Sequence, residues 1–434
     1  MSHDSIFKDY QLGRHTAANG LRVVLVRQPH LHRGTISAYV GAGSRFERVE
    51  DNGLSHFLEH MVFRGTARFP TAFDLNVAVE LLGGTLVAST APDATALSVS
   101  LPRESLERGV ELVAEVLTRP IFDAIDVERK ILVEEIREDL DERGRSIDID
   151  FLSRRRLWPD HPLGRSVTGP IENVMRFGEA DLRRCLDERY CARNTVLCVA
   201  GSFDVDAIAD AVDRAFSPMR RGAISRCEAA PRGPTGPSAA HVDKTGSQTA
   251  LRLAFRAPGL DDPDLDAAEL LLRLLDDGMS TPLHRRVFED RGLAYDVGAD
   301  LETYADTGAL NVDAVCSHEN VVPVAEEVLA ILSELRDRGV RQGDLDKAKR
   351  RAVWSLERHL DDPEAMNAWY GEQELIARVR PLEEEARLIS ALGAADVARV
   401  AGRIVSKADL HVTTVGALGE RQQRALARLA EQGA

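Results

Sequence analysis

The chain contains the same succession of predicted helices and strands twice, and this repeat limits the fold more than any other feature of the sequence. The corresponding segments are two helices joined by a turn at 104–135 and 319–353, and a helix followed by a strand that ends in glycine at 177–201 and 392–416. The offset is 218 residues from Asp126 to Asp344 and 215 residues from Asp181 to Asp396. Because two matches at nearly the same offset rarely arise by chance, we predict an internal duplication.

A stretch rich in proline and glycine separates the two halves. It includes Pro231-Arg-Gly-Pro-Thr-Gly-Pro237, a composition that is typical of a linker with little helix or strand. We therefore predict an N-terminal domain over 1–220, a linker over 221–240 and a C-terminal domain of similar fold over 241–434.

Strands come early in each half and are mixed with long helices. The strand-like segments are Leu21–Val26, Thr35–Val40, Ala96–Leu101, Leu251–Phe255 and Gly308–Val315. They do not alternate strictly with helices, as the strands of a parallel sheet do. The order therefore predicts an α+β fold of two similar halves, each a largely antiparallel sheet covered by helices.

The composition is that of a globular chain with an excess of acidic residues. Asp and Glu number 70 and Lys and Arg 55, a formal net charge of −15. This charge repels phosphate backbones and anionic lipids, so we expect neither nucleic-acid binding nor membrane binding. No apolar run approaches the length of a bilayer span, and residues 1–10 lack the apolar stretch of a secretory signal. The five cysteines form no Cys-x-x-Cys motif, and these features together favour a reduced, cytoplasmic protein.

The clearest chemical signal is the segment His56-Phe-Leu-Glu59-His60. Residues i and i+4 lie one turn apart on one face of a helix, so the two imidazoles can bind a single tetrahedral zinc ion. Glu59 lies beside His60, within reach of a water on the metal without being a ligand. The alternative is a pair of core histidines, and a third ligand is needed to choose between the two interpretations.

Candidates for the third ligand lie on a predicted helix over 126–138. The residues along one stripe of this helix, at steps of four, three and four, are Glu128, Leu132, Glu135 and Asp139. Glu134 points about 100° away from the neighbouring Glu135. The periodicity therefore favours Glu128 or Glu135 for an inward position and does not choose between them.

With these residues in place, the chain resembles the family of pitrilysin, insulysin and the mitochondrial processing peptidase. The resemblance rests on the inverted zinc-peptidase signature HxxEH at 56–60, on a Glu after 74 intervening residues, and on the two-half layout. Further matching segments are Gly83-Gly84, Pro120–Asp123, 128–135, His161–Arg165, Gly292–Tyr295 and Tyr304–Gly308. The length is that of the short, two-domain, bacterial-type members of the family.

The resemblance implies roles for five residues of the first half. One zinc ion per chain would be held by His56, His60 and Glu135, with Glu59 as the general base. Glu128 would support the catalytic site from behind the metal ligands. The first domain would thus bind zinc and carry catalysis, and the C-terminal domain would lack zinc ligands.

The expected second half of the site departs from the family pattern. Tyr295 matches a catalytic tyrosine that stabilises the oxyanion, but Phe288 replaces the arginine that often precedes it by seven residues. Either Tyr295 is sufficient or a partner subunit supplies the missing group. On the presumed substrate strand, Val87 replaces the usual asparagine; an edge strand there could bind an extended peptide through its main chain.

The resemblance therefore implies a zinc metalloendopeptidase, a hydrolase that cuts peptides or extended segments with metal-bound water activated by Glu59. It also implies a dimer, because members of the family enclose a chamber with four such domains. The partner would be a second copy or a paralogous subunit, and the missing arginine favours the heterodimer. The alternative function is a non-catalytic scaffold or assembly subunit of the same fold, but such proteins lose zinc ligands that are all present here.

Overall fold

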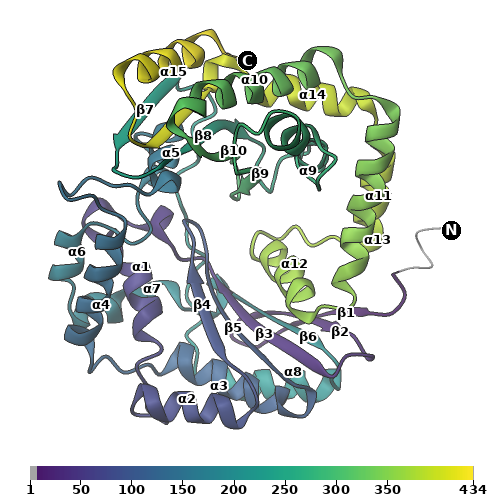
Figure 1. The fold of residues 1–434 in the computed structure, drawn as a ribbon. Helices are drawn as coiled ribbons and strands as arrows, with labels where there is room; N and C mark the ends of the chain where they lie inside the picture. Colours follow the sequence, from purple (N-terminus) through teal and green to yellow (C-terminus); the bar gives the residue numbers. More distant parts are fainter. Residues whose placement is uncertain (1–6, 434) are drawn as a thin grey trace. The chain divides into compact units, whose positions relative to one another are not determined.

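Two β-sheets organise residues 7–433, the part of the chain that the computed structural model describes (Figure 1). Residues 1–6, where we expect no secretory signal, and Ala434 lie outside the described residues. The first sheet has the order β1-β2-β6-β3-β5-β4, formed by Gln11–Thr16, Arg22–Arg27, Thr195–Gly201, Arg33–Val40, Thr95–Pro102 and Leu86–Thr90. The second has the order β7-β11-β8-β10-β9, formed by Ser238–Asp243, His411–Gly416, Gln248–Ala257, Gly308–Ser317 and Asp296–Thr303.

The two sheets share one topology. In the first, β2 pairs in parallel with β6, and β3, β5 and β4 follow in antiparallel order. In the second, β7 pairs in parallel with β11, and β8, β10 and β9 follow in the same antiparallel order. Strand β1 is an addition to the first sheet. The common order confirms the predicted α+β fold of two similar halves, each with a largely antiparallel sheet.

Burial within the first sheet follows the position of each strand. Every residue of the central strand β6 is buried, in keeping with its continuous apolar sequence. Strand β5, one step from the edge, alternates between buried and half-buried residues. Strand β4 is the edge strand, and its Val87 is 55% exposed. Within residues 7–433, the first sheet therefore ends in a strand with one unpaired side.

Helices cover the sheets and supply most of the remaining core. Those of residues 54–215 are α1 (Leu54–Met61), α2 (Ala72–Leu81), α3 (Leu106–Thr118), α4 (Ile125–Glu138), α5 (Ile149–Leu157), α6 (Ile171–Arg176), α7 (Glu179–Arg189) and α8 (Val205–Ala215). Those of residues 265–432 are α9 (Leu265–Leu275), α10 (Val321–Arg338), α11 (Gln342–His359), α12 (Pro363–Leu375), α13 (Leu382–Ala391), α14 (Ala394–Ile404) and α15 (Glu420–Gln432). Among residues 7–433, no helix combines the length and the apolar character that a bilayer span requires.

Each sheet belongs to a compact unit that is discontinuous in sequence. The first unit consists of the residues up to Ile136 together with Arg165–Glu228 and Ser355–Glu385, and the second of Arg137–Gly164, Ala229–Trp354 and Ala386 onward. The units differ from the predicted division at 220 and 241 because one helix of each half belongs to the other unit. Helix α12 packs on β3 and β6 within the first unit, and α5 packs on β8 and β11 within the second.

Two residues of α12 explain why this helix belongs to the first unit. The Asn367 side-chain amide donates hydrogen bonds to the carbonyl oxygens of Thr35 (2.9 Å) and Cys198 (2.7 Å), and the Tyr39 hydroxyl donates to Asn367 Oδ1 (3.0 Å). Gly371 lies so close to Tyr39 that a Cβ atom there would come within 2.1 Å of a ring carbon. These contacts join residues far apart in sequence, so the local composition of the chain carries no sign of them.

Candidate metal centre

Helix α1 carries the two histidines of the predicted motif. It begins after Gly53, whose φ of 97° lies in the left-handed region that favours glycine, and a Cβ at this position would lie 2.5 Å from the carbonyl oxygen of Thr168. The buried apolar side chains of the helix are Leu54, Phe57, Leu58 and Met61. Because these side chains anchor the helix, they also fix the directions in which its histidines point.

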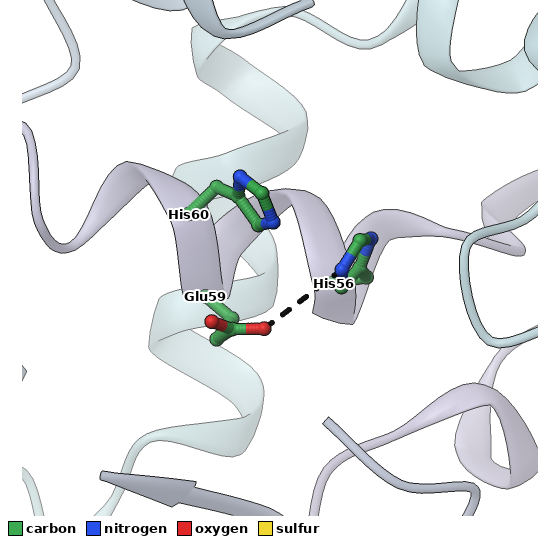
Figure 2. Close-up of side chains that lie close together, drawn as sticks. All are labelled: His56, Glu59 and His60. Carbon is green, nitrogen blue, oxygen red and sulfur yellow. Dashed lines mark ion pairs between the residues drawn. The ribbon is translucent and has the colours of Figure 1, made fainter. Parts of the chain in front are cut away.

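The two imidazoles and the Glu59 carboxylate lie close together on α1 (Figure 2). The ring centroids of His56 and His60 are 4.6 Å apart, with an angle of 72° between the ring planes. Glu59 Oε2 is 3.9 Å from His56 Nε2. One potential ligand atom from each of the three residues lies within 4.8 Å of the other two. The i, i+4 spacing thus places both rings at one point, as helix geometry predicts.

Helix α4 brings two carboxylates to this point, and they take different positions. Glu135 Oε1 lies 3.5 Å from His56 Nε2, and Glu135 Oε2 lies 3.5 Å from His60 Nε2. Glu128 Oε1 instead accepts a hydrogen bond of 2.8 Å from His60 Nδ1, on the other side of that ring. Glu134 is exposed. The structure therefore separates the two candidates that periodicity left open: Glu135 faces both Nε2 atoms, and Glu128 lies behind His60.

Glu128 is held in place by a second partner. Its other oxygen accepts a hydrogen bond from Arg64 Nε, and the residue is only 3% exposed. Burial acts to raise the pKa of Glu128, but the bonds to His60 and Arg64 outweigh burial and lower it below its usual value. Glu128 is therefore a fixed carboxylate that sets the orientation and the tautomer of His60, because a carboxylate can only accept the Nδ1 proton.

The two histidines differ in their electrostatic surroundings. Burial, reinforced by the neighbouring His60, lowers the pKa of His56 to about 4, so its ring is neutral near pH 7. For His60, burial acts to lower the pKa, but the Glu128 hydrogen bond and the charges of Glu59 and Glu135 raise it above its usual value. The carboxylates of Glu59, Glu128 and Glu135 therefore favour a positive charge at this site.

Burial also changes the pKa of Glu59. It raises the pKa of Glu59 above the usual value, against the opposing effects of His60 and of a hydrogen bond of 3.2 Å that Thr90 Oγ1 donates to Glu59 Oε2. A raised pKa makes a carboxylate a better proton acceptor, which is the property of a general base. Thr90 also fixes the orientation of this carboxylate from the end of strand β4.

The donor set suits a zinc ion. Two imidazole nitrogens and one carboxylate form a common set of zinc ligands. The 3.5 Å separations between Glu135 and the two Nε2 atoms are close to the spacing of about 3.3 Å between neighbouring ligands of a tetrahedral ion at about 2.0 Å. When the His60 ring is neutral and its proton is on Nδ1, its Nε2 presents an electron pair towards the electron pairs of Glu135. A cation between these atoms would remove the repulsion between their electron pairs.

Tyr295, the predicted oxyanion ligand, belongs to the second compact unit and is 82% exposed just before strand β9. Phe288 occupies the position of the missing arginine and is 39% exposed. The neighbouring Arg286 forms ion pairs with Glu327 (2.6 Å) and Glu334 (2.9 Å) of helix α10. This arginine is therefore committed to contacts within its own unit.

Three residues of this region were not among the predicted site residues. Arg64 follows His60 by four residues, a spacing that would have suggested a neighbour one turn away. Thr90 is 31 residues from Glu59, and no periodicity connects them. Glu47 accepts hydrogen bonds from the backbone at the start of α1, and no local motif indicates this contact.

Two family models and several relatives match this sequence. The family model described as "Insulinase (Peptidase family M16)" matches residues 22–171, and the model "Peptidase M16 inactive domain" matches residues 176–352. An uncharacterized zinc protease of Mycobacterium tuberculosis is 33% identical over 405 residues, which cover 91% of each chain. A probable mitochondrial-processing peptidase subunit beta of Arabidopsis thaliana is 26% identical over 430 residues, covering 96% of this chain and 80% of the relative.

A solved structure extends the comparison to the fold. A protease from Helicobacter pylori superimposes with a TM-score of 0.87 at 20% identity, over 94% of this chain and 99% of the other. At this identity the match concerns the fold alone, whereas the mycobacterial relative matches in sequence over nearly the whole chain. The chain therefore belongs to the insulinase family of peptidases, family M16.

Proposed function

We propose that the chain is a zinc-dependent endopeptidase that hydrolyses peptides or extended segments of polypeptide. The proposal rests on the positions of two carboxylates, those of Glu135 and Glu59, near the Nε2 atoms of the histidines. Glu135 lies 3.5 Å from both nitrogens, while Glu59 lies 3.9 Å from His56 Nε2 and is oriented by Thr90. A ligand and a separate base are the two acidic functions that metal-assisted hydrolysis needs.

Zinc would be held by His56, His60 and Glu135, one ion per chain. When bound, it supplies a Lewis acid for the scissile carbonyl and lowers the pKa of water. Residues of the chain keep the two histidines ready to bind the ion. Glu128 holds the proton of His60 on Nδ1, so that Nε2 keeps its electron pair for the metal. His56 keeps its electron pair near pH 7 because burial lowers its pKa to about 4.

Glu59 is the general base of the proposed reaction. Its carboxylate would accept a proton from the attacking water and later return it to the leaving amine. Burial raises the pKa of Glu59, which strengthens it as a proton acceptor. Thr90 donates to one carboxylate oxygen, Oε2, so the other oxygen remains available for the proton.

Strand β4 is the proposed binding strand for the substrate. It is the edge strand of the first sheet, and among the described residues it pairs on one side only, with β5. An extended peptide can add to such an edge through main-chain hydrogen bonds, with little dependence on side-chain identity. Because Thr90 lies in β4 and contacts Glu59, a peptide on this strand would lie near the base. The exposed Val87 would then contact the substrate, in place of the family's usual asparagine.

We also propose that the enzyme works as a dimer, with Tyr295 contributing to oxyanion stabilisation. One relative is named as a subunit of a processing peptidase, and one structural match is a chain of the complex III dimer of Candida albicans. The partner of this chain would be a second copy or a paralogous subunit that supplies the group missing at Phe288. A cytoplasmic location is supported by the acidic composition and by five cysteines without a Cys-x-x-Cys motif.

The variant Glu59→Gln tests the proposal. We expect it to retain about one zinc per chain and to lose at least about a hundredfold in kcat/KM on a quenched peptide, because general-base catalysis contributes about that much or more. Glu80→Gln, on the exposed side of α2, is the control and should keep both properties. Normal cleavage by Glu59→Gln would exclude Glu59 as the base. Wild-type protein without stoichiometric zinc would instead support the scaffold alternative.

A further inference from the structure

The ligand helix α1 begins without a capping side chain of its own. Its N-cap residue is Gly53, which offers no side-chain acceptor, yet the first amide groups of any helix lack partners within the helix. In this protein a carboxylate from outside the helix takes that place. Glu47 Oε2 accepts a hydrogen bond of 2.9 Å from the Gly53 N–H, and Glu47 Oε1 accepts one of 2.6 Å from the Ser55 N–H.

The Glu47 carboxylate is suited to this position both by geometry and by charge. Its two oxygens bind amides on either side of Leu54, so they fix the first turn of α1 at two points. The Asn52 side chain donates a third hydrogen bond, of 3.2 Å, to Oε2. A negative charge at this end also interacts favourably with the partial positive charge of a helix N-terminus. Burial raises the pKa of Glu47, and the two backbone hydrogen bonds oppose that effect.

The backbone around Glu47 is itself fixed. The Arg165 guanidinium donates a hydrogen bond of 2.5 Å to the Glu47 carbonyl oxygen, and the Asn52 side chain also donates to the Ser166 carbonyl oxygen at 2.8 Å. Glu47 is therefore a link between a fixed segment and the start of α1. His56 follows Ser55 directly, so any rotation of the first turn would move its imidazole away from Glu135.

We propose that Glu47 is a positioning residue for the metal centre: by holding the Gly53 and Ser55 amides, it fixes the place of His56 relative to Glu135. The proposal rests on the proposed zinc function for its metal-binding consequence. Its structural consequence, a firmly held first turn of α1, is independent of any metal. Glu47 bonds to the backbone amides of α1, so its effect on the site passes through the helix backbone.

The test compares two capping carboxylates of the same unit. Glu47→Ala removes the cap of α1, and Asp204→Ala removes the cap of α8, where Asp204 Oδ1 accepts a bond of 2.9 Å from the Ala207 N–H. Glu47→Gln provides a milder variant that keeps the shape of the side chain if Glu47→Ala folds poorly. The readouts are the Kd for Co²⁺ with the visible spectrum of the bound ion, and amide hydrogen exchange of residues 53–61 in metal-free protein.

We expect both Glu47 variants to bind Co²⁺ at least about tenfold more weakly, in the range known for residues that support metal ligands. Their spectra should change, and residues 53–61 should exchange faster, while Asp204→Ala alters neither property. Unchanged affinity and exchange in the Glu47 variants would overturn the proposal, as would an equal loss of affinity in Asp204→Ala. Failure of the wild-type protein to bind Co²⁺ would contradict the proposed zinc function, and the exchange rates would still decide whether Glu47 holds α1.

Discussion

His60 donates its Nδ1 proton to Glu128 over 2.8 Å, and the opposite nitrogen of the same ring faces Glu135 at 3.5 Å. One imidazole is thus placed between two carboxylates of helix α4 that lie seven residues apart. The hydrogen bond fixes both the tautomer and the orientation of the ring, which leaves Nε2 as the only nitrogen able to bind a metal. The two acidic residues that looked equivalent in the sequence therefore take different positions around His60.

Replacing Glu128 tests this difference. We expect Glu128→Gln to weaken zinc binding by about tenfold to a hundredfold, because the amide can no longer fix His60 with a charged acceptor. The variant also leaves Arg64 without its buried charged partner, so some stability should be lost as well. Competition with a chelator of known affinity measures the effect, and Glu134→Gln, on the exposed side of the same helix, serves as the control. Equal zinc affinities in the two variants would contradict the role of Glu128.

Thr90 provides a test of how Glu59 is oriented. Thr90→Val keeps the shape and the strand propensity of the side chain but removes the hydrogen bond to Glu59. We expect kcat to fall about tenfold with zinc content unchanged, because a hydrogen bond to a charged group contributes about 1.5 kcal/mol or more. Thr90→Ser should recover most of the activity.

The matched control for Thr90 is Thr35→Val. Thr35 also lies in the first sheet, and its hydroxyl pairs with the Ser100 hydroxyl at 2.9 Å, which couples it to strand β5 rather than to the site. This variant should lose some stability and keep its kcat. A loss of kcat in Thr35→Val as large as that in Thr90→Val would show that any weakening of the sheet impairs catalysis.

Helix periodicity predicted much of the site and left one choice open. The i, i+4 spacing correctly indicated that His56 and His60 share one face, since that relation depends only on local geometry. The stripe on α4 identified both Glu128 and Glu135 as inward residues, and only the packing of α4 against α1 separates their positions. Contacts such as that of Thr90 with Glu59 depend on how a strand packs against a helix, which no local pattern encodes.

The fold was predicted to a similar extent. The internal repeat correctly indicated two similar halves, because each strand and helix carries its own periodicity. Membership of the compact units was not predictable in the same way. Helix α12 belongs to the first unit through Asn367 and Gly371, and these residues have partners more than a hundred positions away. The linker over 221–240 stays a prediction, and its composition carries no information about a helix of one half that belongs to the compact unit of the other half.

Because His411 is buried, we expect the protein to lose stability in mild acid. Its two ring nitrogens are hydrogen-bonded to the hydroxyls of Thr235 (2.8 Å) and Ser238 (2.7 Å), and burial lowers its pKa to about 4. The unfolded chain, with a histidine pKa near 6.5, therefore binds the proton first as the pH falls. Below pH 6.5 this favours unfolding, and the penalty should reach about 2 kcal/mol at pH 5.

Chemical denaturation of metal-free protein at pH 7.5 and pH 5 measures the effect of His411. Other histidines also titrate in this range, so the relevant quantity is the difference between the wild-type protein and His411→Gln. The variant should be less stable at pH 7.5 and should lose about 2 kcal/mol less on going to pH 5. Identical pH dependence in both proteins would show that His411 does not contribute to acid sensitivity.

Replacing glycine by alanine should have opposite effects on stability at two helical positions, Gly371 and Gly402. A Cβ atom at Gly371 of α12 would lie 2.1 Å from the Tyr39 ring, whereas one at Gly402 of α14 would meet no described atom within 4 Å beyond its chain neighbours and the backbone of its own helix. Alanine stabilises an unobstructed helix by up to about 1 kcal/mol relative to glycine. We therefore expect Gly402→Ala to raise the free energy of unfolding slightly and Gly371→Ala to lower it by about 2 kcal/mol, because α12 must move away from the sheet.

The Gly371 effect should depend on the ring that it contacts. In a Tyr39→Leu background the clash is removed, so Gly371→Ala should cost much less there than in the wild-type protein, which a double-mutant cycle measured by chemical denaturation would detect. Equal costs in the two backgrounds would mean that the close approach of α12 to Tyr39 does not determine the need for glycine. Because Asn367 lies one turn before Gly371 and bonds to the backbone of β3 and β6, loosening α12 should also expose the central strands of the first sheet to hydrogen exchange. A loss of protection confined to α12 itself would instead show that the sheet retains its stability when α12 is loosened.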